Sequence, residues 1–158
     1  MKNTITPCLW FDTEAEEAAN LYTTVFKDSR VDHISRYNGE GKEIHGKDSG
    51  SVMTVNFTIN GQPFVALNGG PMFPFNEAIS FQVFCDTQEE IDHYWDALTK
   101  DGGEEGQCGW LKDRFGVSWQ VVPSMLGELM SDPEKAEVVT KAFLKMKKID
   151  IEALKQAV

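Results

Sequence analysis

Apolar and polar residues alternate along most of the chain, and two stretches instead repeat apolar residues every three or four positions. Alternation predicts strands with one buried face, and the longer period predicts amphipathic helices. The strands are expected at 5–11, 30–37, 52–59, 62–68, 79–85, 105–112 and 115–122, and the helices at about 13–26 and 87–100. Each helix follows an Asp-Thr pair, whose side chains are good N-caps. The polar, glycine-containing stretch 38–50 is expected to be a loop.

This order of elements occurs twice. The segment LWFDTEAEEAANLYTTV, which begins at Leu9, aligns with VFCDTQEEIDHYWDAL from Val83, and GQPFVAL from Gly61 aligns with GVSWQVV from Gly116. The repeat predicts an α+β fold in which paired βαβββ modules, at about 1–70 and 77–123, form one domain, residues 1–123, with a curved mixed sheet. A chance likeness between amphipathic units is the alternative. Three short helices are expected after Pro123, as a C-terminal helical extension over 124–158.

The alternation also assigns side chains to the two faces of the predicted sheet. Large apolar residues should pack under the helices: Leu9, Phe11, Phe64, Phe81, Val83 and Trp119. The other, concave face should line one cavity with Trp10, Asn56, Ser80, Gln82 and Gln120. Neutral amides and hydroxyls there could orient a small molecule, whereas the absence of a cation disfavours a strongly anionic ligand. The side of Lys112 stays open, and a face that meets only water or a partner protein is the alternative.

Composition excludes several classes of partner. The chain has 158 residues, with 25 acidic against 15 basic residues and a net charge of −10. Nucleic acid and anionic membrane surfaces need a basic footprint and are therefore poor partners. No apolar run approaches the roughly 20 residues of a membrane span, and the N-terminus shows no export signal. Three widely spaced cysteines without a C-x-x-C pair are typical of reduced thiols, so we expect a cytoplasmic protein.

Few residues have the spacing of a reactive site. His33, His45 and His93 show no metal-ligand spacing, and Cys8 has no histidine placed by sequence to activate its thiol, so we expect Cys8 to be a small buried apolar residue. The acidic pairs at the helix starts, Glu16-Glu17 and Glu89-Glu90, complement the helix dipoles. The glycine-rich turn with which many enzymes bind S-adenosylmethionine does not occur in the sequence, which argues against methyl transfer.

Four stretches resemble a known family. FDTEAEEAANLYTTVF, VMTVNFTINGQPFVALNGGP, FNEAISFQVFCDTQEEIDHYW and CGWLKDRFGVSWQVVP are similar to the PhnB-like group, often labelled 3-demethylubiquinone-9 3-methyltransferase, of the vicinal oxygen chelate superfamily. The resemblance covers residues 5–123 and implies a glyoxalase-like fold. Metal enzymes of this superfamily place His, Gln or Glu ligands on the first and last strands of each module. The matching positions here are Thr6 or Cys8, Val65 or Leu67, Ser80 or Gln82, and Gln120.

That ligand set is almost entirely neutral and suits a divalent ion poorly, so we predict neither a metal nor another cofactor. The interpretation is a homodimeric protein that binds a small molecule in the concave cavity. The first alternative is a metal-dependent lyase, isomerase or oxygenase of the glyoxalase and dioxygenase type. The second is an interaction module that uses the apolar loop tip formed by Met72, Phe73 and Phe75.

Overall fold

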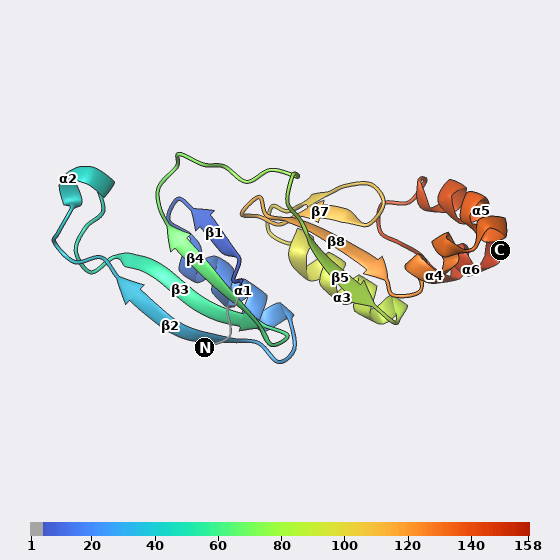
Figure 1. The fold of residues 1–158 in the computed structure, drawn as a ribbon, viewed down its shortest axis with the longest axis horizontal. Coiled ribbons are helices and arrows are strands. Elements are labelled where there is room, and N and C mark those ends of the chain that lie inside the picture. Colours follow the sequence, from blue (N-terminus) through green and yellow to red (C-terminus); the bar gives the residue numbers. More distant parts are fainter. Residues whose placement is uncertain (1–4) are drawn as a thin grey trace. The chain divides into compact units, whose positions relative to one another are not determined.

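The computed structural model describes residues 5–158, so residues 1–4 of the predicted first module lie outside the described part. The chain forms two compact units, and the boundary between them in the sequence lies between Pro74 and Phe75. Each unit has its own four-stranded mixed sheet (Figure 1). Among the described residues, no helix is both long and apolar enough to cross a membrane.

The first unit is a βαβββ module. Its strands are β1 (Cys8–Phe11), β2 (Arg30–Arg36), β3 (Val52–Ile59) and β4 (Gln62–Asn68), in the sheet order β1-β4-β3-β2. Only β1 and β4 pair in parallel, and a tight turn at the predicted Asn60-Gly61 joins β3 to β4. The helix α1 (Ala15–Val25) packs against β2, β3 and β4. The predicted loop at 38–50 contains a four-residue helix, α2 (Lys42–His45), which glycines with left-handed backbone conformations flank at both ends.

The core of the first unit lies between α1 and the sheet. Small residues on α1 let the helix approach the strands, where the Tyr22 and Phe57 ring centroids lie 6.1 Å apart and the Phe57 and Phe64 rings stack at 5.4 Å. Leu9 and Phe11 are also buried, as the alternation predicted. The period of two therefore identified correctly which side of these strands meets the helix.

The start of α1 differs from the prediction. Asp12 and Thr13 do not cap the helix; instead the backbone N–H of Ala15 donates a 2.8 Å hydrogen bond to Oδ1 of Asn68, at the end of β4. The Asn68 amide in turn donates to the Val52 carbonyl oxygen at 3.1 Å. One buried side chain thus joins the helix start to two strands, because β1 and β4 run in parallel and end beside α1.

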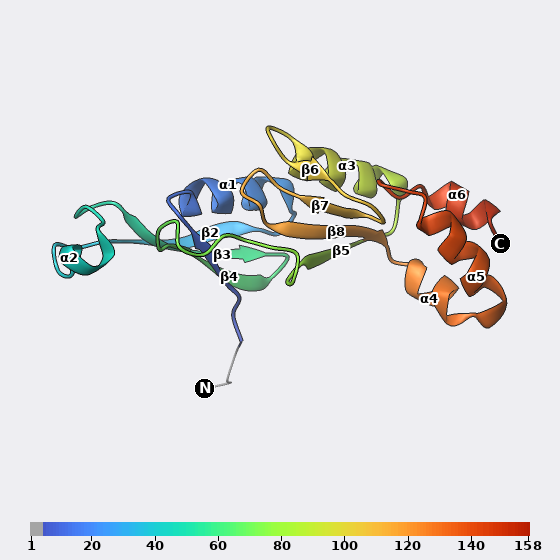
Figure 2. The ribbon, with the colours of Figure 1, turned by 90° about the horizontal axis from the view of Figure 1, so that it is seen from above.

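The second unit repeats the βαβββ module. Its elements are β5 (Phe81–Cys85), α3 (Gln88–Thr99), β6 (Glu104–Glu105), β7 (Trp110–Lys112) and β8 (Ser118–Pro123), with the sheet order β5-β8-β7-β6. The single strand predicted at 105–112 is two strands, because a turn intervenes in which the Gly106 N–H bonds to the Trp110 carbonyl. Thr87 caps α3 as predicted, accepting from the Glu90 N–H at 3.2 Å. Figure 2 shows α3 against one face of this sheet.

Three further helices complete the second unit: α4 (Leu126–Ser131), α5 (Pro133–Phe143) and α6 (Ile151–Gln156). Asp132 and Asp150 cap α5 and α6. The Gln88 side chain on α3 donates to the Ile149 carbonyl at 3.0 Å and accepts from the Ile151 N–H at 2.9 Å, which ties α6 to the module. The separation of 124–158 from a domain at 1–123 stays a prediction.

The two modules share one strand register. Cys8 lies opposite Val65 in the parallel pair β1–β4, and Gln82 lies opposite Gln120 in the parallel pair β5–β8. The sequence repeat likewise aligns Cys8 with Gln82 and Val65 with Gln120. The predicted α+β fold with paired βαβββ modules is therefore confirmed, with one four-stranded sheet in each module.

Candidate functional site

In each unit one face of the sheet, here called the open face, points away from the module's long helix. On the second unit's open face the predicted site residues Ser80, Gln82 and Gln120 form a chain of hydrogen bonds. The Gln120 amide nitrogen donates to the Ser80 hydroxyl at 2.8 Å, and the Gln82 amide nitrogen donates to the Gln120 oxygen at 3.3 Å. Ser80 and Gln120 are half-buried and Gln82 is exposed. This amide–hydroxyl chain keeps further donors and acceptors for a ligand.

The other two predicted site residues lie on the open face of the first unit. Trp10 is half-buried: its indole N–H donates to the Gly70 carbonyl at 2.8 Å, and its ring meets Phe73 edge-on at 5.0 Å between centroids. Asn56 is exposed and lies opposite Val65. Trp10 can therefore offer a ligand an apolar surface but not its N–H group. That all five residues line one cavity stays a prediction.

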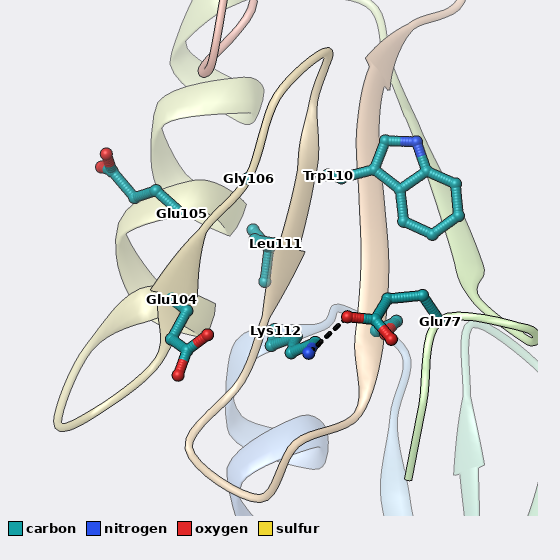
Figure 3. A pocket seen from close by; sticks show the side chains of 8 residues that line it. Glu77, Glu104, Glu105, Gly106, Trp110, Leu111 and Lys112 are labelled. Carbon is teal, nitrogen blue, oxygen red and sulfur yellow. Dashed lines mark ion pairs between the residues drawn. The ribbon is translucent and has the colours of Figure 1, made fainter.

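A pocket of about 170 Å³ lies beside the amide–hydroxyl chain, and Figure 3 shows the side chains that line it. We call it the Trp110 pocket, and its lining consists of Glu77, Glu104, Glu105, Gly106, Trp110, Leu111, Lys112 and Ser118. Trp110 lies directly opposite Gln120 across β7 and β8, and Lys112 lies opposite Ser118. The sequence had left the side of Lys112 open; the register places it on the open face with Trp110.

An ion pair crosses this pocket. Lys112 Nζ contacts the Glu77 carboxylate, which belongs to the segment before β5, and Figure 3 shows the two side chains meeting in front of β8. The hydrogen bond to Glu77 raises the pKa of Lys112, and the same hydrogen bond lowers the pKa of Glu77. Both groups are therefore charged at neutral pH. Sequence reasoning missed Glu77, because nothing in a loop sequence indicates which strand its carboxylate will reach.

The Ser118 hydroxyl is the unusual group of this pocket. Its side chain belongs to the polar open face, where it lies opposite Lys112, yet the residue is only 2% exposed. Within residues 5–158, Ser118 Oγ is a buried polar side-chain atom for which no hydrogen-bond partner is found. Leaving a buried hydroxyl unpaired costs free energy, so this group is suited to accept or donate a bond to a bound molecule.

A second buried network fixes the geometry of β7 and β8. In the turn between these strands, Asp113 Oδ1 accepts from the Phe115 N–H at 2.9 Å and the Val117 N–H at 3.1 Å. Its Oδ2 accepts from the Trp119 indole N–H at 2.9 Å. The carboxylate thus holds the turn that sets Lys112 opposite Ser118.

The donors at the predicted metal positions do not suit a metal ion. Cys8, Val65, Gln82 and Gln120 supply one thiol, two neutral amides and an alkyl group. The described residues contain no group of three or more His, Cys, Asp or Glu side chains that could hold a metal. A divalent ion prefers anionic oxygen, imidazole or thiolate, so these positions do not fit the ion that metal enzymes of the superfamily use.

The prediction that Cys8 is buried is wrong. The residue is exposed, because the alternation along β1 points its side chain to the open face while Leu9 turns inward. Partial burial of the sulfur nevertheless raises the pKa of the Cys8 thiol, which favours the protonated, less nucleophilic form. His33 lies three strands away along the same row, opposite Asn56, so β4 and β3 separate it from the thiol.

Paired βαβββ modules, each with a helix on one face of its sheet, define a glyoxalase-like protein of the vicinal oxygen chelate superfamily. The sequence profile of the family described as 3-demethylubiquinone-9 3-methyltransferase matches residues 3–122. The chain therefore belongs to that family. A search of curated protein sequences finds no match.

Solved structures share this fold. The chain is similar to a PhnB protein from Bacillus cereus, with 36% identity and a TM-score of 0.68 over 77% of this chain and 100% of the other. Protein PA1353 from Pseudomonas aeruginosa shares the fold at 19% identity and a TM-score of 0.59, over 77% and 98% of the two chains. The fosfomycin resistance protein FosX from Mesorhizobium loti does so at 14% identity and 0.57, over 84% and 99%.

Proposed function

We propose that this protein binds a small organic molecule on the open faces of its sheets without a metal ion. The observation that carries the proposal is the amide–hydroxyl chain of Ser80, Gln82 and Gln120, which lies beside the Trp110 pocket. Hydrogen bonds within the chain orient two amides in advance, so a ligand would lose less free energy in ordering them. Trp10 and Asn56 are proposed to contribute from the first unit.

The experiment is a thermal-shift screen of small neutral and zwitterionic metabolites, followed by titration of the hits against variants. Gln120→Leu removes the central amide, and Gln156→Leu, an exposed residue on α6, is the matched control. Hits should bind Gln120→Leu more weakly and Gln156→Leu as the unmodified protein does. Equal binding to Gln120→Leu, with its fold verified by circular dichroism, would refute the assignment of this face.

The metal-free part of the proposal rests on the donor chemistry and has its own test. Protein purified without chelators should contain far less than one equivalent of Zn, Ni, Fe or Mn by elemental analysis. Near-stoichiometric metal that survives dialysis would contradict it and favour a metal-dependent enzyme. We do not propose methyl transfer, because the sequence has no glycine-rich turn for S-adenosylmethionine; micromolar binding of that compound in calorimetry would overturn this view.

We further propose that the protein is a cytoplasmic homodimer. Three unpaired cysteines support the compartment. The loop tip supports self-association, because the side chains of Met72 and Phe73 are 73% and 57% exposed and monomers seldom leave such apolar groups together in water. Light scattering at micromolar concentration should give about twice the chain mass of 17.7 kDa, and a clean monomer would contradict the dimer.

A further inference from the structure

We propose that the Trp110 pocket binds the primary ammonium group of a small organic cation. This inference rests on the proposed function and names the ligand class at its site. Three features of the pocket carry it: the charge of its lining, the indole of Trp110, and the unpaired hydroxyl of Ser118.

The lining carries more negative than positive charge. Of its carboxylates, Glu105 is already engaged, because it accepts from the Trp95 indole N–H at 3.0 Å and lies 3.8 Å from Lys147 Nζ. Glu77 and Glu104 remain against a single cation, Lys112, so the pocket keeps a net charge of about −1. Glu104 lies directly opposite Lys112 across β6 and β7, and its charge contributes to the raised pKa of Lys112. A cation would restore neutrality here, whereas an anion would add to the excess.

Trp110 supplies a surface that favours the same class of ligand. Its ring is half-buried and extends over the open face on the side where Glu77 lies (Figure 3). The face of an indole attracts a cation within about 6 Å of its centroid, more strongly than any other side-chain ring. A ligand between this ring and the Glu77 carboxylate would meet negative electrostatic potential on both sides.

Ser118 distinguishes this pocket from a cluster of surface acids. Its hydroxyl is buried and unpaired, and Ser118 lies opposite Lys112 across β7 and β8. A primary ammonium group has N–H donors for both this hydroxyl and a carboxylate, so it would satisfy the group that the fold leaves unsatisfied. The pocket holds about 170 Å³, equivalent to roughly five or six waters, so the bound part of the ligand is small.

The experiment compares three probes that share one ring and differ in charge: benzylammonium, benzyl alcohol and benzoate. Binding is followed by two-dimensional NMR on the full chain, with the Trp110 indole N–H resonance as the local reporter. Benzylammonium should bind more tightly than benzyl alcohol by roughly threefold to tenfold, and benzoate should bind most weakly. The preference should weaken with added salt, since the charges are partly exposed.

Variants test each feature separately. Glu104→Gln should reduce benzylammonium affinity by roughly threefold, whereas Glu128→Gln on α4, away from the sheet, should not change it. Ser118→Ala should weaken benzylammonium more than benzyl alcohol. Glu77→Gln should reduce the preference for benzylammonium over benzoate, because it removes one of the two carboxylates that outweigh Lys112.

The outcomes separate this inference from the function on which it rests. If benzoate binds the unmodified protein as well as benzylammonium does, or if Glu104→Gln has no effect, the inference is wrong. The proposed function would still stand where neutral hits bind in a manner that depends on Gln120. If those hits also bind Gln120→Leu as tightly as the unmodified protein, both the inference and the proposed function are wrong.

Discussion

The substitution Gly69→Ala tests how the first unit holds Trp10 in place. Gly69 follows β4 and lies against the indole ring, and a Cβ atom built there would lie 2.2 Å from Cζ2 and 2.3 Å from Cε2 of Trp10. Real Cβ atoms essentially never approach other atoms so closely, and a fused ring cannot bend away as a flexible chain can. The backbone of Gly69 is not left-handed, so the substitution acts through steric overlap alone.

The loss in free energy of unfolding can be estimated from the contacts that the Trp10 ring would lose. Displacing Trp10 breaks its hydrogen bond to the Gly70 carbonyl, worth about 0.5–1.5 kcal/mol, and its edge-on contact with Phe73, worth a similar amount. The strain of an overpacked site adds about 1–3 kcal/mol. Relaxation of the loop offsets part of this, so we expect Gly69→Ala to lower the free energy of unfolding by about 2–4 kcal/mol.

Urea denaturation followed by circular dichroism measures this change, as a midpoint shift of about 1–2 M. Gly39→Ala is the control, because nothing lies within 4 Å of a Cβ atom there. Trp10→Leu removes the obstructing ring atoms, so adding Gly69→Ala to that background should cost little. A loss below about 1 kcal/mol in the single variant, or an undiminished loss beside Trp10→Leu, would refute the steric argument.

Three further predictions concern other contacts. Asn68→Ala removes the helix cap and a strand contact, so the free energy of unfolding should fall by about 1–3 kcal/mol in urea denaturation; unchanged stability would contradict this role. Burial, and secondarily nearby acids, raise the pKa of Cys85 to about 12, so iodoacetamide at pH 8.5 should alkylate exposed Cys8 and spare Cys85 in peptide mass mapping; equal labelling of the folded protein would refute this. Lys112→Met should destabilise the protein by a constant amount near neutral pH, and the difference should shrink as the pH falls through the lowered pKa of Glu77, because protonation of Glu77 ends the ion pair of the unmodified protein; a difference independent of pH would show that the pair contributes nothing.

Local patterns predicted the modules well. The alternation at Leu9 and Phe11 and the threonine cap at Thr87 depend on neighbours in the sequence, and the structure confirms them. The same alternation placed Ser80, Gln82 and Gln120 on one face, and the structure joins these three by hydrogen bonds. Period-two patterns assign faces reliably because a strand has only two of them.

Contacts between distant segments could not be predicted in this way. The cap of α1 comes from Asn68, 53 residues after Ala15, whereas the sequence offered a nearer and plausible pair of caps. The burial of Ser118 depends on side chains from β7 and from the loop before β5, and the alternation indicates only the face to which Ser118 belongs. The charge of the Trp110 pocket was missed for the same reason, because Glu77 reaches Lys112 from a loop.

Because the two modules share one strand register, a residue pair of one module can be introduced at the equivalent positions of the other and compared with the original. Positions 8 and 65 are the geometric counterparts of Gln82 and Gln120, but they hold Cys and Val. The double substitution Cys8→Gln and Val65→Gln would place an amide pair on β1 and β4 and leave Gln82 and Gln120 unchanged. Comparing the grafted and native pairs within one polypeptide would separate what two amides do by themselves from what they do beside Trp110.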